Sequence, residues 1–132
     1  VSPDRGLASE RHEPWLANQS GKVNMEWVTP ESSRQWRAFC RLAERLQGRG
    51  NELLVVVGPL NEHMMNDATR EKHRSFRSTA VAWLEGEGIR FVVPELLPSE
   101  EFADASHPLT EGYKRLAKRL AEESLFRAWL GQ

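Results

Sequence analysis

Asp104 and His107 are the residues of this sequence whose types and spacing could do chemistry. They stand three positions apart in the run DASHP, so on a turn the carboxylate can reach back to the Nδ1 atom of the imidazole. That contact fixes the tautomer and stabilises the imidazolium, which leaves Nε2 to take a proton from a hydroxyl nucleophile. We therefore expect an acid–base pair here, while the same pattern also describes a turn with a capping Asp and a surface His.

Two short apolar runs supply the strands that must position this pair. Leu53–Val57 and Ile89–Val93 are rich in branched side chains, as are strands covered on both faces in a parallel sheet. Active residues of open parallel sheets gather beyond the carboxyl ends of the strands. Asn61 and His63 follow the first run directly, so we expect them to line a pocket near His107.

Helices are expected between and after these strands, which gives the α/β class. A capping hydroxyl at Thr29 and a proline after it predict a helix start. Further helices are predicted from Asp67 to about Glu85 and from Thr110 onward. Alternating helices and strands imply right-handed crossovers and adjacent parallel strands.

The chain divides into an irregular amino-terminal arm and an α/β part. Residues 1–28 show no sustained hydrophobic period and are expected to form one helical turn around Trp15. Residues 29–132 carry the predicted helices and strands. Two strands make a small sheet with two open edges, so the α/β part is expected to be incomplete without upstream strands, or to associate as a dimer.

The block around Asp104 and His107 resembles the last motif of the SGNH (GDSL-type) ester hydrolases. In residues 103–117, ADASHPLTEGYKRLA, an Asp and a His three apart precede a proline, and Gly-Tyr opens the final helix. Upstream, LVVVGPLN at 54–61 resembles the penultimate strand of that family, and the likeness covers Thr29 to Leu120 in order. It implies part of a three-layer α/β/α, flavodoxin-like fold.

The resemblance implies a serine esterase or O-acetyl esterase, with Asp104 and His107 as catalytic residues. The family's Gly-Asp-Ser nucleophile motif is absent from this sequence, so the chain is expected to be the carboxy-terminal part of the enzyme and inactive alone. The expected substrate is a small acyl ester or an acetylated saccharide, with no cofactor. An acyltransferase of the same fold and a non-catalytic binding domain remain as alternatives.

Composition argues against other classes of function. Eighteen Lys and Arg against 19 Asp and Glu give a net charge of −1, without the basic face that nucleic acid binding needs. No apolar run is long enough to span a bilayer. His63 and His73 lack the spacing of a helix-borne zinc site. The single Cys40 allows no internal disulfide and falls in an apolar helical stripe, as a buried structural Cys does.

Overall fold

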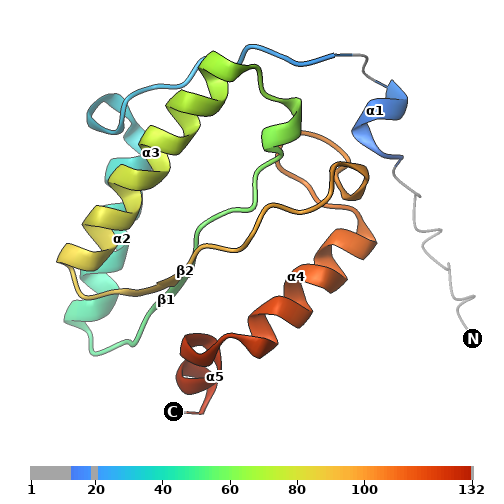
Figure 1. Ribbon diagram of the computed structural model, residues 1–132. Helices are drawn as coiled ribbons and strands as arrows, with labels where there is room; N and C mark the ends of the chain where they lie inside the picture. The colour runs from blue at the N-terminus through green and yellow to red at the C-terminus, as the bar shows by residue number, and fades with distance from the viewer. Residues whose placement is uncertain (1–12, 19–20, 132) are drawn as a thin grey trace, which may run out of the picture.

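The protein, seen as a computed structural model, is a helix-rich α/β chain with one small parallel sheet (Figure 1). The structure describes residues 13–18 and 21–131. Of the amino-terminal arm predicted over residues 1–28, residues 1–12, 19 and 20 therefore lie outside the described residues. In the described part of the arm, as expected, a single helical turn forms at the predicted tryptophan, α1 (Trp15–Asn18).

The sheet consists of β1 (Leu54–Val56) and β2 (Arg90–Val92), which are adjacent and parallel. Leu54 pairs with Arg90 and Val56 with Val92. The predicted pairing is confirmed, although each strand is one residue shorter at either end than the apolar run that predicted it. The carboxyl ends of both strands meet at one edge, which brings the two loops after them together.

Two layers of helices flank the sheet. On one side lie α2 (Arg34–Gly48) and α3 (Asp67–Gly86), and on the other α4 (Thr110–Glu122) and α5 (Ser124–Leu130) (Figure 1). The side chains that face α2 and α3 form one apolar cluster, built on the buried residues Ala43, Leu84 and Ile89 with strand and helix residues Phe39, Leu53, Val55, Val57, Trp83 and Phe91 packed against them. Val55 of β1 and the two residues that flank the strand, Leu53 and Val57, face this cluster, because side chains alternate along an extended chain.

The helix boundaries follow their capping residues, and one start differs from the prediction. The chain at Pro30–Ser32 forms a 3-10 turn, and α2 begins only after Ser33, whose hydroxyl accepts the N–H of Trp36 at 3.1 Å. The helix start predicted after Thr29 is therefore wrong for α2, since a second hydroxyl four residues on, that of Ser33, caps the helix. The α3 start is confirmed, with the Asn66 side chain accepting the N–H of Thr69.

A second apolar cluster lies beneath the loops rather than beneath the sheet. Trp15 packs there with Met64, Leu97 and Phe102, and its backbone N–H donates to the Phe102 carbonyl at 2.9 Å. Trp15 is 4% exposed, so this chain itself covers the large aromatic side chain. The segment around Trp15 thereby holds the base of the loop that carries Asp104 and His107.

Bilayer insertion through a helix has no support in the described ranges. None of the helices in residues 13–18 and 21–131 combines the length and the apolar character needed to cross a membrane.

Candidate functional site

The loop after β2 closes on itself into a tight turn at its far end. Phe102 and Pro108 form an antiparallel bridge, and the Ala103 N–H donates to the His107 carbonyl at 2.8 Å. Residues 104–106 thus form the tip of the turn. The turn presents its side chains at the same edge of the sheet as the loop that follows β1.

Asp104 holds the turn with its side chain. Its Oδ1 atom accepts the N–H groups of Ser106 at 2.9 Å and of His107 at 2.8 Å. Both carboxylate oxygens lie 2.9 Å from Nδ1 of His107. Partial burial raises the pKa of the Asp104 carboxyl, but the hydrogen bonds from Ser106 and His107 together outweigh burial and leave this pKa below its ordinary value.

The imidazole of His107 is oriented by this contact. An ionised carboxylate can only accept, so Nδ1 donates and the neutral ring carries its free electron pair on Nε2. Among the described residues, Nε2 of His107 makes no hydrogen bond, and the side chain is 69% exposed. The structure thus brings together the two residues that the sequence pairs, in the geometry an acid–base pair needs.

Asn61 links the loop after β1 to this turn from behind. Its backbone N–H donates to the Ala105 carbonyl at 2.9 Å, and its Nδ2 donates to the Asp104 carbonyl at 3.2 Å. Asn61 is completely buried, and its Oδ1 has no partner among the described residues. Where the sequence suggests a pocket-lining residue, the structure has a buried support for the backbone of Asp104.

His63 serves the neighbouring segment rather than the pair. It lies half-buried in a 3-10 turn, Glu62–Met64 (η2), and its Nε2 lies 2.8 Å from the Leu97 carbonyl. This contact ties the loop after β1 to the loop after β2. One ring nitrogen of His63 is thereby committed to a backbone group.

An ion pair and a close contact with α4 fix the base of the turn that carries Asp104 and His107. Arg115 of α4 binds the carboxylate of Glu101 through two nitrogens at 2.7–3.0 Å, and the hydrogen bond to Arg115 lowers the pKa of Glu101. At Gly112 a Cβ atom would lie 2.8 Å from the Glu101 carbonyl oxygen and 3.0 Å from Pro108 Cβ. Only a glycine allows α4 to pass this close to the turn.

The described residues provide no nucleophile for His107. The nearest hydroxyl, Ser106 Oγ, lies 3.3 Å from Nδ1, the nitrogen already bound to Asp104. Cys40 belongs to α2, and burial raises the pKa of its thiol, which disfavours the reactive thiolate. Nε2 can accept a proton, and among the described residues no hydroxyl is placed to give one.

Metal binding has no support in the part of the chain that the structure describes. No three side chains among its His, Cys, Asp and Glu converge as metal ligands. The carboxylate of Glu62, the residue before His63, forms an ion pair with Arg74 at 3.1 Å.

Comparisons with known proteins name no family for this chain. No protein-family model matches it, and neither the curated proteins nor the solved structures contain a match. The resemblance to SGNH hydrolases therefore stays a prediction from the sequence.

Sequence reasoning missed three features around the site. These are the burial of Trp15 under the turn, the Glu101–Arg115 pair and the supporting role of Asn61. None of these three has a local sequence signal. The close contact of α4 at Gly112 does have one, since a glycine in the first turn of a helix is unfavourable unless something approaches closely.

Proposed function

We propose that Asp104 and His107 are the acid and base of an SGNH-type ester hydrolase whose serine nucleophile is not part of this chain. The observation that carries the proposal is the contact of both Asp104 oxygens with Nδ1 at 2.9 Å, on a His107 side chain that is 69% exposed. Support also comes from the location of the pair, beyond the carboxyl ends of two parallel strands. We also propose that the chain is part of a three-layer α/β/α fold.

In this proposal His107 Nε2 removes the proton of a serine hydroxyl as its oxygen attacks the ester carbonyl carbon. Asp104 stabilises the imidazolium that forms. The tetrahedral oxyanion then collapses, the ester C–O bond breaks, and the leaving alcohol takes the proton from Nε2. Water repeats the sequence on the acyl-enzyme, which releases the acid and the free serine. An alcohol acceptor in place of water would make the same enzyme an acyltransferase.

The test is made in the complete enzyme, which carries this segment together with its serine. We expect His107→Ala to lower the hydrolysis of p-nitrophenyl acetate by several orders of magnitude. Asp104→Asn should cost less, on the order of 10³–10⁴-fold, because the ring loses its orientation but remains present. Both variants should keep the circular dichroism of the parent, since the two side chains are exposed.

Ser106→Ala is the matched control. Its hydroxyl approaches the nitrogen that is already engaged, so we expect esterase activity within a few-fold of the parent. A fluorophosphonate probe, which loses fluoride as it bonds to an activated serine, should label a serine outside residues 1–132. Loss of labelling in Ser106→Ala, or full activity in His107→Ala, would contradict the proposal.

A non-catalytic binding domain is the second candidate, and one observation favours it. Among the described residues no hydroxyl or thiol lies within hydrogen-bonding distance of His107 Nε2. If this candidate holds, no serine of the complete protein reacts with the fluorophosphonate probe, and His107→Ala changes no ester turnover.

A further inference from the structure

A cavity of about 300 Å³ lies at the carboxyl ends of both strands, separate from the acid–base pair. Its apolar lining includes Leu60 after β1, Leu96 after β2, Phe76 and Ala80 of α3, and Trp27 of the arm. Neither Asp104 nor His107 is among its lining residues. Asn61, between two lining residues, directs its contacts to the turn of the pair instead. The cavity is therefore a second candidate site.

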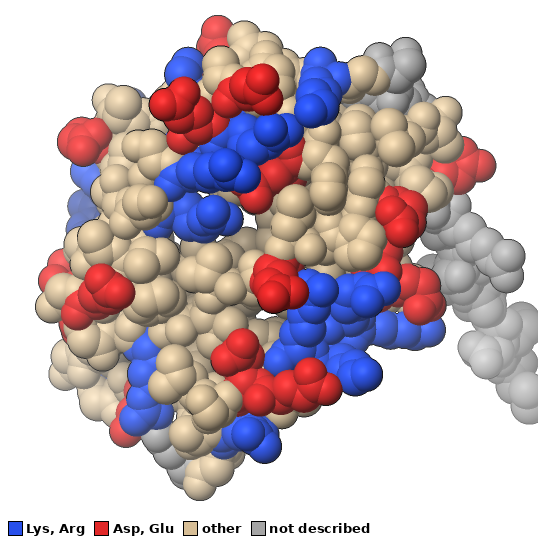
Figure 2. Space-filling model, viewed as in Figure 1, with Lys and Arg blue, Asp and Glu red and all other residues tan. Residues whose placement is uncertain are grey.

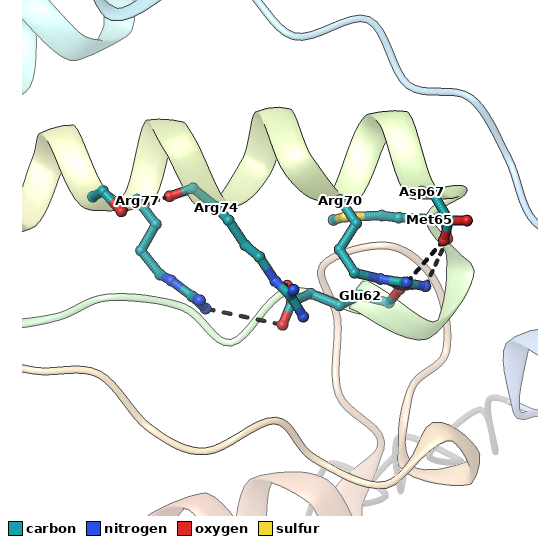
Figure 3. Close-up of polar contacts among 7 residues, drawn as sticks. Glu62, Met65, Asp67, Arg70, Arg74 and Arg77 are labelled. Atoms are coloured by element: carbon teal, nitrogen blue, oxygen red, sulfur yellow. Dashed lines mark hydrogen bonds and ion pairs between the residues drawn. The ribbon is translucent and has the colours of Figure 1, made fainter.

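The charged groups of this cavity are unequally paired. The buried carboxylate of Glu62 accepts a hydrogen bond from Nε of Arg74 at 3.1 Å, and the charge of Arg74 neutralises that of Glu62. Arg77, which lines the cavity, lies 3.9 Å from the other oxygen of Glu62, beyond hydrogen-bonding distance (Figure 3). Arg77 makes no hydrogen bond among the described residues, so its guanidinium donors remain available.

The helix that carries Arg77 adds to the positive charge. Arg70, Arg74 and Arg77 project from one face of α3 toward the turn that holds Glu62 (Figure 3). Arg70 is paired with Asp67 at 3.1 Å. With Arg74 paired to Glu62, the charge of Arg77 is left over. In Figure 2, basic side chains gather over α3 beside a hollow in the surface.

The remaining polar groups of the lining do not cancel this charge. The ring of His73 packs on Trp27 with centroids 5.2 Å apart, and burial lowers the pKa of His73, which favours its neutral form. The indole Nε1 of Trp27 is buried and has no acceptor among the described residues. The cavity thus combines an apolar interior, one unused donor and one incompletely paired guanidinium.

We propose that this cavity binds a small amphipathic anion, with an apolar or aromatic body among Leu60, Phe76 and Leu96 and a carboxylate or sulfonate on Arg77. Pockets of this size and character bind small molecules through an apolar lining and a few polar groups that fix orientation. A planar guanidinium suits a two-oxygen anion, which it can bind through two parallel hydrogen bonds.

Two fluorescent probes of similar shape and different charge test the anion preference. They are 8-anilinonaphthalene-1-sulfonate, an anion, and N-phenyl-1-naphthylamine, which is neutral. We expect Arg77→Gln to weaken binding of the sulfonate about tenfold and to leave the neutral probe within about twofold, because only the charge contact is lost. Arg127→Gln, on α5, is the matched control and should change neither affinity. Equal sulfonate affinity in Arg77→Gln and the parent would overturn the proposal.

A second variant tests the location. Ala80 is a buried lining residue of α3, and Ala82 is an exposed residue of the same helix. We expect Ala80→Phe to fill the cavity and weaken both probes at least about tenfold, and Ala82→Phe to leave both affinities unchanged. Probe binding that survives in a folded Ala80→Phe variant would place the probes elsewhere and refute the site. Arg77→Gln is a separate variant, and it removes no hydrogen bond of the described residues, so we expect it to fold. Its result therefore tests the proposal even if Ala80→Phe does not fold.

Discussion

At the scale of single residues, Asp104 performs two tasks with one carboxylate. It caps the turn through two backbone N–H groups and orients the His107 ring. Because these contacts favour the ionised form, the pKa of Asp104 is lower in the folded protein than in the unfolded chain. They stabilise the fold fully at pH values above the ordinary Asp pKa, and this stabilisation is lost as the pH falls through the lowered folded-state pKa.

Carboxyl NMR measures this directly. In the folded protein we expect the side-chain carbon of Asp104 to titrate with a midpoint below the ordinary Asp value. In His107→Ala the midpoint should rise toward that value, because the hydrogen bond and the charge of the ring are removed. An identical midpoint in both proteins would mean that the ring does not interact with the carboxylate in solution.

Asn61 allows a second test at this scale. Asn61→Ala removes the hydrogen bond to the Asp104 carbonyl and leaves a gap where a completely buried side chain lay. We expect the free energy of unfolding, measured with urea, to fall by about 1–3 kcal/mol. The control is Asn51→Ala, an exposed residue whose Nδ2 donates to Leu46, with an expected change within about 0.5 kcal/mol. Equal losses in both variants would show that burial of Asn61 has no special effect.

At the scale of elements, the close passage of α4 over the loop depends on Gly112. In Gly112→Ala the added methyl group meets the Glu101 carbonyl and Pro108. Overpacking of this kind costs about 1–3 kcal/mol, and the better helix propensity of Ala returns up to about 1 kcal/mol. We therefore expect a net loss of about 1–2 kcal/mol in the free energy of unfolding.

Gly86, at the end of α3, is the control for this substitution. A Cβ atom there meets nothing within 4 Å, so Gly86→Ala should leave stability unchanged or raise it by up to about 1 kcal/mol. A stabilised Gly112→Ala would mean that α4 shifts away from the turn at little cost.

The elements themselves were readable from sequence where local chemistry decides them. Branched apolar runs predicted both strands, and the helix predicted from Asp67 is α3. The start of α2 was predicted at the wrong residue, because Thr29 and Ser33 are both good caps and only the folded chain selects one. The Asp104–His107 contact followed from spacing, since three residues on a turn leave few arrangements. Trp15 and Arg115 act across long sequence separations, where no local pattern reports a partner.

At the scale of the whole molecule, the sheet is small for the apolar surface it carries. It has two strands, all three side chains of β1 are only partly buried, and the outer edge of each strand has no partner strand in the described part of the chain. Open edges and half-covered apolar strands promote association. We therefore expect the isolated chain to dimerise, exchange elements or aggregate. Light scattering across micromolar to millimolar concentration checks this, and a monomer over the whole range would count against an incomplete domain.

The burial of Trp15 has a consequence for the order in which the molecule folds and opens. Its indole meets Ser99 across a separation of 84 residues, whereas the two strands are joined by one helix. Contacts that close long loops form late, because the chain entropy lost in closing them is recovered only at the end. The segment around Trp15 should dock after the sheet and its helices, and should be among the first described parts to detach. The base of the His107 turn would then loosen while the sheet is still intact, so that the contact between Asp104 and His107 should have a lower melting point than the fold.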